Sequence, residues 1–271
     1  MSAMSTIAII GAGSIGEALI AGLIGAGRDP QSIIATNRTV SRNRYLAQTY
    51  GVRTSNDNET VVDGADFLVI AVKPAQVVPL LGELSDTIAH NDSTIVVSLA
   101  AGVSVGAMEE ALSAGTPVVR VMPNTPMLVG KGVSACAAGR FVTDDQMDSV
   151  AELLRTVGEV VRVKESEMDA VCALSGSAPA YYFLMAEALV DAGVSLGLSR
   201  ELSTTLAKCV ASGAGALVEQ HDGELSALRA AVSSPAGTTV AAVRELEESG
   251  LRGAIYRATE ACAKRSAELG S

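Results

Sequence analysis

The first half of the chain alternates short apolar runs with longer stretches whose apolar residues recur at helical spacing. This alternation predicts a parallel β-sheet that is covered by helices on both faces. Strands are expected at Thr6–Ile10, Ser32–Thr36, Phe67–Val72, Thr94–Leu99, Val118–Met122, Lys131–Ala137 and Val160–Val163. Helices are expected at Ile15–Gly25, Ser41–Tyr50, Ala75–Ile88, Val105–Leu112 and Asp144–Thr156.

After about Val163 the pattern changes to segments rich in Ala and Leu, with helical period and few β-branched runs. We therefore expect an α/β domain over residues 1–164 and an all-α domain over residues 165–271. The second domain carries many small residues, which favour close packing against a partner subunit. Its helices are expected at Glu165–Leu174, Pro179–Leu196, Arg200–Glu219, Gly223–Ala231, Thr239–Ser249 and Leu251–Leu269.

Composition narrows the function classes. The chain has 271 residues, and 48% of them are hydrophobic, which is enough to build a core. The net charge of −10 argues against nucleic acid as a partner, since a phosphate backbone favours a basic face. A small anionic ligand stays compatible with this charge, because backbone dipoles can hold an anion locally.

Metal chemistry and disulfides are not expected. With two histidines the chain cannot build a three-histidine zinc site, and its four cysteines are widely spaced without a C-x-x-C pair. We predict no metal, and thiols that serve as small hydrophobic residues in a reducing cytoplasm. The cysteines are Cys136, Cys172, Cys209 and Cys262.

The sequence predicts neither a signal peptide nor contact with a membrane. The apolar N-terminal stretch lacks a positive region, because the first positive charge is Arg28, and Glu17 interrupts the stretch. No segment reaches the roughly 18 apolar residues that suggest a membrane span. A cytoplasmic location is therefore expected.

A glycine-rich loop, Gly11-Ala12-Gly13-Ser14-Ile15-Gly16, directly follows the first predicted strand and opens a helix. This is G-x-G-x-x-G in the context that dinucleotide binding requires. The first glycine permits a tight turn, the second lets the backbone approach a pyrophosphate, and the third lets helix and strand pack closely. An ordinary βα turn is the alternative, but the continuing βαβ pattern favours a Rossmann domain. The predicted phosphate-binding residues are Gly11, Gly13, Ser14, Ile15 and Gly16.

The end of the second strand indicates which dinucleotide is bound. Enzymes that use NAD usually carry Asp or Glu there, whereas this chain has Thr36-Asn37-Arg38-Thr39. Arg38 can contact a 2′-phosphate through two parallel hydrogen bonds, although it could also simply face solvent. We predict NADPH, with NADH as the alternative, and include Asn37 and Arg38 among the cofactor-binding residues.

Three further strand ends are expected to line the same edge of the sheet, where open α/β sheets bind ligands. They are Ala71-Val72-Lys73-Pro74, Leu99-Ala100-Ala101-Gly102 and Met122-Pro123-Asn124-Thr125-Pro126. Taken alone, Lys73 would be interpreted as a surface charge, and Asn124 could be simply a turn residue. The predicted cofactor-binding residues at these ends are Ala71, Val72, Lys73, Pro74, Ala100, Ala101 and Asn124.

In the second domain, a polar loop from Val232 to Thr239 stands immediately before a predicted helix. Backbone N–H groups at such a place bind a carboxylate, and the hydroxyls of Ser234, Thr238 and Thr239 add donors. A helix N-cap without a ligand is the alternative, since Ser and Thr favour that position.

These motifs occur in an order that resembles one family. The order is the glycine loop, Ala71–Pro74, Val121–Pro126, Leu174-Ser175-Gly176-Ser177-Ala178-Pro179-Ala180-Tyr181 and Ser233–Thr239. Together they resemble pyrroline-5-carboxylate reductase over essentially the whole chain. The resemblance implies a Rossmann domain followed by a helical dimerisation domain. It also implies NADPH- or NADH-dependent reduction of 1-pyrroline-5-carboxylate to L-proline, at a site completed by the partner subunit, in homodimers that often assemble into decamers.

The resemblance also implies roles for single residues. Asn58 matches a position that contacts the cofactor ribose, Glu165 one near the substrate nitrogen, and Thr239 the residue beside the ring nitrogen, which is the catalytic candidate. Ser234, Gly237, Thr238 and Thr239 would hold the substrate. The sequence departs from the family at Ala231, where some members have a polar substrate contact, and at Ala178, which replaces a frequent Gly.

Three other interpretations compete. A β-hydroxyacid dehydrogenase needs a Lys in the first interdomain helix, and Leu174–Leu189 has none. A serine hydrolase needs G-x-S-x-G at a sharp strand-to-helix turn. The two matches, Gly102–Gly106 and Gly193–Gly197, place their serines at a helix cap and late in a helix. A sensor that binds NADPH without turnover remains the third alternative.

Overall fold

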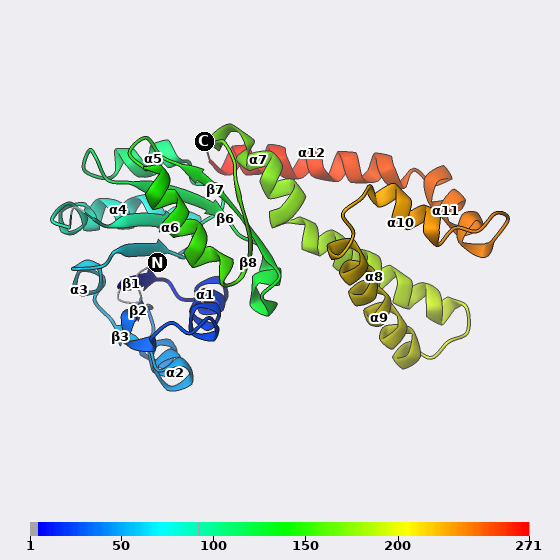
Figure 1. Ribbon diagram of the computed structural model, residues 1–271, viewed down its shortest axis with the longest axis horizontal. Helices are drawn as coiled ribbons and strands as arrows, with labels where there is room; N and C mark the ends of the chain where they lie inside the picture. The colour runs from blue at the N-terminus through cyan, green and yellow to red at the C-terminus, as the bar shows by residue number, and fades with distance from the viewer. Residues whose placement is uncertain (1–4, 92, 271) are drawn as a thin grey trace. The chain divides into compact units, whose positions relative to one another are not determined.

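The computed structural model describes residues 5–91 and 93–270, so residues 1–4, 92 and 271 of the two predicted domains lie outside the description. The chain forms two compact units (Figure 1). The first, here the sheet unit, runs up to Gly176 and includes the chain from Cys262 onward. The second, here the helical unit, is Ser177–Ala261.

The sheet unit is built on eight strands in the order β3-β2-β1-β4-β5-β6-β7-β8. All neighbouring strands are parallel except β6 and β7. Only residues 123–131 connect these two, which is too short for the crossover that parallel strands need, so β7 returns antiparallel. The strands are β1 Ile7–Ile10, β2 Ile33–Thr36, β3 Arg53–Ser55, β4 Phe67–Ile70, β5 Ile95–Ser98, β6 Val118–Met122, β7 Gly132–Ala138 and β8 Gly158–Arg162.

The strand order reverses between β1 and β4. Strands β1, β2 and β3 succeed one another outward in one direction, and β4 returns to pair with the other side of β1. The register places Ile10 level with Thr36 on one side and with Ile70 on the other, so three carboxyl ends meet at this point. Open α/β sheets bind their ligands at such a switch point.

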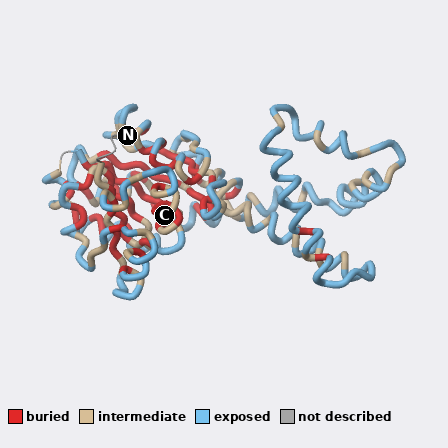
Figure 2. The backbone as a smooth tube through the Cα atoms, turned by 60° about the horizontal axis from the view of Figure 1, so that its bottom comes forward, coloured by how far each residue is buried: buried red, intermediate tan, exposed pale blue. Residues whose placement is uncertain are grey.

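Two apolar clusters cover the two faces of the sheet. Along β1, Ile7 and Ile9 belong to one cluster, whereas Ala8 and Ile10 belong to the other, because successive side chains of a strand point to opposite faces. In Figure 2 the buried residues are concentrated in the sheet unit. Its helices are α1 Ser14–Gly25, α2 Val40–Tyr50, α3 Asn58–Val62, α4 Pro74–Ala89, α5 Val105–Glu110, α6 Asp144–Arg155 and α7 Met168–Val171.

The structure corrects the predicted elements at three places. Strand β3 and helix α3 were not expected, because a polar three-residue edge strand and a five-residue helix carry no periodic apolar signal. The helix expected at Glu165–Leu174 is instead a 3₁₀ turn at Glu165–Glu167, the short α7, and a π-helical turn at Cys172–Gly176.

The helical unit is all-α. Helices α8 and α9 pack against each other closely: a Cβ added at Gly193 would lie 2.6 Å from the Oγ of Ser203. Ser203 and Ala207 are its buried residues, and most of its large apolar side chains are exposed. The helices that contribute to it are α8 Ala178–Ser195, α9 Arg200–Glu219, α10 Leu225–Ala231, α11 Thr238–Glu248 and α12 Leu251–Leu269, whose last turns belong to the sheet unit.

Candidate active site

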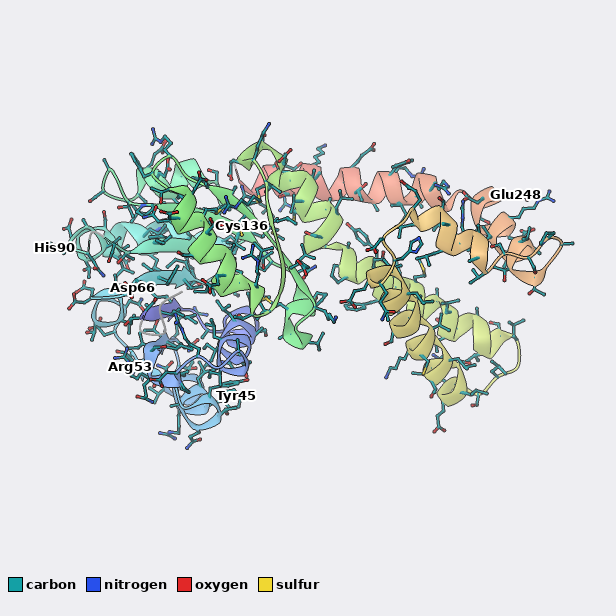
Figure 3. All side chains as sticks on the ribbon, viewed as in Figure 1. Tyr45, Arg53, Asp66, His90, Cys136 and Glu248 are labelled. Carbon is teal, nitrogen blue, oxygen red and sulfur yellow. The ribbon has the colours of Figure 1, made fainter. Side chains whose placement is uncertain are left out.

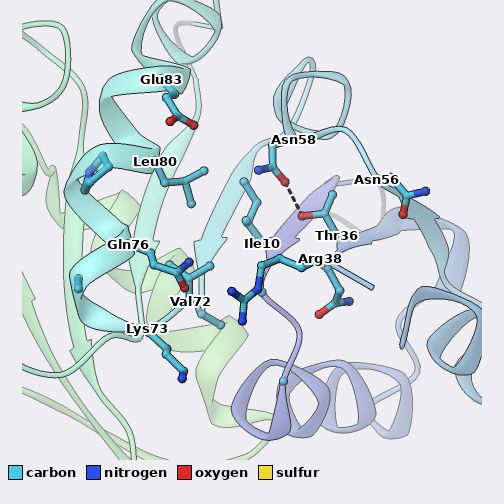
Figure 4. A pocket seen from close by; sticks show the side chains of 16 residues that line it. Ile10, Thr36, Arg38, Asn56, Asn58, Val72, Lys73, Gln76, Leu80 and Glu83 are labelled. Atoms are coloured by element: carbon cyan, nitrogen blue, oxygen red, sulfur yellow. Dashed lines mark hydrogen bonds between the residues drawn. The ribbon is translucent and has the colours of Figure 1, made fainter. Parts of the chain in front are cut away.

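A cavity of about 600 Å³ opens in the sheet unit at the switch point, beyond the ends of β1, β2 and β4 (Figure 4). This volume lies within the range of small-molecule and cofactor pockets. The predicted cofactor residues that line it are Gly11, Gly13, Asn37, Arg38, Asn58, Ala71, Val72 and Lys73.

The glycine loop forms one wall of this cavity. Gly11 has a φ of +86°, and a Cβ there would lie 2.9 Å from the backbone nitrogen of Val72, so no other residue fits. At Gly13 the nearest protein atom to an added Cβ is 3.9 Å away, because Gly13 borders the cavity. A ligand can therefore approach the backbone closely at this position.

Helix α1 starts at Ser14, directly after the loop. The first N–H groups of a helix have no partners within it, and they form the positive end of its dipole. Gly16 is buried, and a Cβ there would lie 3.4 Å from atoms of Ala12 and Ile9, which reflects tight packing of the helix on β1. The positive end of this helix thus begins directly after the lining residue Gly13.

The opposite wall is polar and tied together by side chains. Thr36 Oγ1 donates to Asn58 Oδ1 over 2.7 Å, as the dashed line in Figure 4 shows. Asn37 Nδ2 donates to Asn43 Oδ1 over 2.9 Å, and Asn43 donates to Asn56 Oδ1 over 2.7 Å. Because its acceptor oxygen is occupied, Asn58 offers amide donors to a ligand.

Arg38 lines the same wall. It is exposed and forms no hydrogen bond or ion pair with any of the residues that the structure describes. Its guanidinium is therefore available to an anion that enters the cavity.

Helix α4 supplies a third wall that was not predicted beyond its first residues. Gln76, Leu80 and Glu83 line the cavity in Figure 4, and they stand at positions i, i+4 and i+7 of this helix. Helical spacing counted onward from Lys73-Pro74 would have found them, because these positions share one face. The other unpredicted lining residues are Ile10, Thr36, Asn56, Ala75 and Pro79.

Other predicted cofactor residues lie outside the cavity lining. The side chain of Asn124 is held at both ends, since its Nδ2 donates to the Ser175 carbonyl over 3.1 Å and its Oδ1 accepts from the Val133 N–H over 2.9 Å. The remaining six are Ser14, Ile15, Gly16, Pro74, Ala100 and Ala101.

Glu165 lies in the sheet unit beside a buried arginine. Its Oε1 accepts from Arg120 Nη1 over 2.7 Å and from the Val105 N–H over 3.1 Å, and the Arg120 side chain is 8% exposed. Its Oε2 is buried and has no hydrogen-bond partner among the described residues. One carboxylate oxygen is thus fixed, while the other keeps its capacity to accept.

In the helical unit, the loop before α11 has the form of an anion site. The Gly237 N–H donates to the Ser234 carbonyl over 3.0 Å, and Thr238 and Thr239 are the first two residues of α11. Ala236 has a φ of +57°, the left-handed region that L-residues rarely adopt. The turn leaves the first N–H groups of the helix and two hydroxyls together.

Neither histidine takes part in these arrangements. His90, labelled in Figure 3, ends α4 with its ring Nδ1 2.6 Å from the Asp86 carbonyl, and His221 Nε2 lies 3.3 Å from the Glu224 carbonyl. Among the described residues, no group of three or more His, Cys, Asp or Glu side chains could hold a metal ion. Nor is any helix within residues 5–91 and 93–270 long and apolar enough to cross a membrane.

Comparison with protein families finds one match in the N-terminal part of the chain and one in the C-terminal part. Residues 6–102 match the family "NADP oxidoreductase coenzyme F420-dependent", and residues 165–269 match "Pyrroline-5-carboxylate reductase dimerisation". Together with the cavity at the switch point, these matches define an NAD(P)-binding oxidoreductase with a helical dimerisation domain. The predicted fold class is thereby confirmed.

Individual relatives narrow the class. The chain is 55% identical to pyrroline-5-carboxylate reductase of Corynebacterium melassecola over 98% of this chain and 99% of that protein. It superposes on a pyrroline-5-carboxylate reductase from Coxiella burnetii with a TM-score of 0.94, at 36% identity and 99% coverage of both chains. The Plasmodium falciparum enzyme, solved with NADP bound, gives a TM-score of 0.86 at 29% identity, with 98% of both chains covered. The chain belongs to the pyrroline-5-carboxylate reductase family, and the predicted enzyme class is confirmed.

Proposed function

We propose that the chain reduces 1-pyrroline-5-carboxylate to L-proline with NADPH, and that NADH is the weaker donor. The observation that carries this proposal is that the chain, a member of this family, has two different places where backbone N–H groups at the start of a helix could hold an anion. One is the cavity at the switch point, and the other is the Ser234–Thr239 loop at the start of α11. A dinucleotide needs the first site, and a small carboxylate needs the second.

The cavity walls fit a dinucleotide. The glycine loop and the first N–H groups of α1 would hold the pyrophosphate, and Asn58 would donate to a ribose oxygen. Arg38 would pair with the 2′-phosphate that distinguishes NADPH from NADH. When bound, the nicotinamide supplies the hydride. We propose that the other predicted cofactor residues, Asn124 included, also border the bound dinucleotide.

The substrate loop would hold the carboxylate through backbone N–H groups at the start of α11 and through the hydroxyls of Ser234 and Thr238. A side chain at Gly237 would be crowded, since a Cβ would lie 2.5 Å from Ser234 Oγ and 3.0 Å from the Ser234 carbonyl oxygen. Thr239 would donate a hydrogen bond to the ring nitrogen. We also propose Glu165 as a residue near that nitrogen.

The reaction balances with one hydride and one proton. A hydride adds to the imine carbon, which must lie within roughly 3–3.5 Å of the donor carbon. The ring nitrogen takes up a proton if the substrate arrives as the neutral imine, and none if it arrives as the iminium ion. Because a threonine hydroxyl is a weak acid, Thr239 would stabilise and relay and would not be a strong proton donor.

We further propose that residues 1–164 bind the cofactor and that residues 165–271 dimerise and bind the substrate, in the cytoplasm. The match of residues 165–269 to a dimerisation family supports a homo-oligomer. We propose that five homodimers assemble into a decamer. The four free cysteines favour a reducing compartment. Light scattering would give the number of subunits.

A direct absorbance assay with product identification tests the function. The enzyme is mixed with NADPH and 1-pyrroline-5-carboxylate, the absorbance of the reduced nicotinamide is followed, and the product is identified by mass. Oxidation with formation of proline is expected. Oxidation without proline would indicate another imine reductase, and binding of NADPH without oxidation would indicate a sensor; either result rejects the proposal.

A further inference from the structure

Arg42 of helix α2 connects to the glycine loop from outside the cavity. Its Nε donates to the Ala12 carbonyl over 2.9 Å, and its Nη2 reaches the Gly13 carbonyl at 3.2 Å. Arg42 itself is not among the residues that line the cavity. It thus contacts the loop without occupying the space of a ligand.

The two carbonyl groups belong to the peptide units that carry the N–H groups of Gly13 and Ser14. The Gly13 N–H donates to the Gly11 carbonyl over 2.7 Å, so the Ser14 N–H is the one that a pyrophosphate would meet. A peptide unit is planar, so fixing its oxygen also fixes the direction of its N–H. Arg42 therefore sets the orientation of the backbone at the point where a pyrophosphate would approach.

A carboxylate anchors the arginine. Glu17, in the first turn of α1, accepts from Arg42 Nη2 over 2.5 Å and from the hydroxyls of Tyr45 and Tyr50, each over 2.9 Å. The guanidinium carbon also lies 5.2 Å from the ring centre of Tyr45, which Figure 3 labels on α2. The guanidinium is thus held at its nitrogens and at its face.

The protonation states agree with this arrangement. Burial alone would raise the pKa of Glu17, but hydrogen bonds from Arg42, Tyr50 and Tyr45 outweigh burial and hold this pKa below its ordinary value. Burial and the hydrogen bond to Glu17 raise the pKa of Tyr50 to about 12. Near neutral pH the Glu17 carboxyl is therefore charged and the Tyr50 hydroxyl is protonated. Without Arg42, an unpaired anion would remain in the first turn of the helix that faces the phosphates.

We propose that Arg42, anchored by Glu17, is a positioning residue for the cofactor pyrophosphate. This inference rests on the proposed function, since it needs a dinucleotide in the cavity. Arg42 also stands four residues after Arg38. Its hydrogen bonds therefore link the segment that would contact the 2′-phosphate to the loop that would contact the pyrophosphate. Both NADPH and NADH have a pyrophosphate, so both depend on Arg42, whereas Arg38 serves only NADPH.

The test is equilibrium binding of NADPH and NADH, with kcat measured at saturating cofactor. Arg42→Ala is expected to raise both dissociation constants by roughly tenfold, because the glycine loop loses its hydrogen bonds from a charged side chain. It should leave kcat within about twofold. Arg44→Ala, at an exposed position of the same helix, is the matched control and should change neither constant. Arg38→Ala should weaken NADPH alone.

Two more variants separate positioning from a plain structural role. Arg42→Lys keeps the charge but loses the planar fork, so it should fold and still weaken both cofactors several-fold. The double variant Arg42→Ala with Glu17→Gln removes the unpaired anion and should recover part of the affinity that Arg42→Ala loses. If Arg42→Ala does not fold, Arg42→Lys decides.

Unchanged dissociation constants in a folded Arg42 variant would overturn the inference while the proposed function stands. A loss confined to NADPH would overturn it too, because Arg42 would then serve the 2′-phosphate. If the wild-type enzyme binds neither cofactor, the proposed function itself fails.

Discussion

The two units of this chain differ in how far their apolar side chains are buried. In the sheet unit, strand residues such as Leu68 of β4 are fully buried, at 0% exposure. In the helical unit, Phe183 of α8 is 65% exposed, and Tyr182 and Leu184 beside it are exposed too. Three successive apolar residues cannot share one face of a helix, so α8 is apolar on several sides at once.

This difference shows what each unit requires. The sheet unit buries its core within one chain, and the cavity at its switch point is formed by its own strands and helices. The helical unit leaves many large apolar side chains exposed, which agrees with its match to a dimerisation family. Substitutions in the helical unit should therefore change assembly or turnover while cofactor binding by the sheet unit persists, and substitutions in the sheet unit should change cofactor binding or the stability of that unit.

Phe183→Asp should have the largest effect. A charge in an apolar subunit interface costs roughly 3 kcal/mol or more in each subunit, so the dimer dissociation constant should rise more than a hundredfold. Analytical ultracentrifugation would show smaller species, while NADPH binding by the sheet unit persists. Phe183→Leu is the apolar control. An unchanged mass distribution would refute the assignment of α8 to the interface.

Thr239→Ala should come next. Removing the hydroxyl at the start of α11 is expected to lower kcat by roughly a hundredfold and to leave the dissociation constant of NADPH unchanged. Steady-state kinetics and cofactor titration measure the two quantities separately. Thr239→Ser keeps the hydroxyl and should recover most of the rate. A kcat near the wild-type value in the alanine variant would remove Thr239 from the chemistry.

Arg38→Ala should raise KM for NADPH by about tenfold, because it loses a charge-assisted contact to the 2′-phosphate, and should leave KM for NADH little changed. Initial rates with each cofactor check this. An equal effect on both would contradict the 2′-phosphate role and move Arg38 into general phosphate binding.

The smallest effect concerns the alkaline stability of the sheet unit. Tyr50 has a pKa raised from 10.0 to about 12, by burial first and then by its hydrogen bond to Glu17. The folded state therefore holds this proton more tightly than the unfolded chain. The resulting stability is full below pH 10 and is lost as pH rises through about 12.

Tyr50→Phe has no such proton to lose. Its Tm should fall less than that of the wild type between pH 9 and about pH 12. Thermal melts across this range, referred to each protein's Tm at pH 7, provide the measurement. An equal fall in both proteins would show that Tyr50 does not contribute.

The sequence predicted the parts of the site that depend on backbone chemistry. Gly11 and Gly13 of the glycine loop and Ala71–Lys73 after β4 border the cavity, because the first turn and the strand ends of a βαβ unit form its ligand-binding edge. Strand β3 was missed because Arg-Thr-Ser has no apolar alternation, and its pairing with β2 depends on the rest of the sheet. Arg42 was missed because its partners, Ala12, Gly13 and Glu17, become neighbours only on folding.

Isotope transfer tests the central claim most directly. NADPH is prepared with deuterium at C4 of the nicotinamide in either of the two positions, and each form is supplied with 1-pyrroline-5-carboxylate. We predict that one form yields L-proline with a single deuterium on the ring carbon that was the imine carbon, and that the other form yields unlabelled proline. Proline without deuterium from both forms, or no proline at all, would contradict hydride transfer by this enzyme.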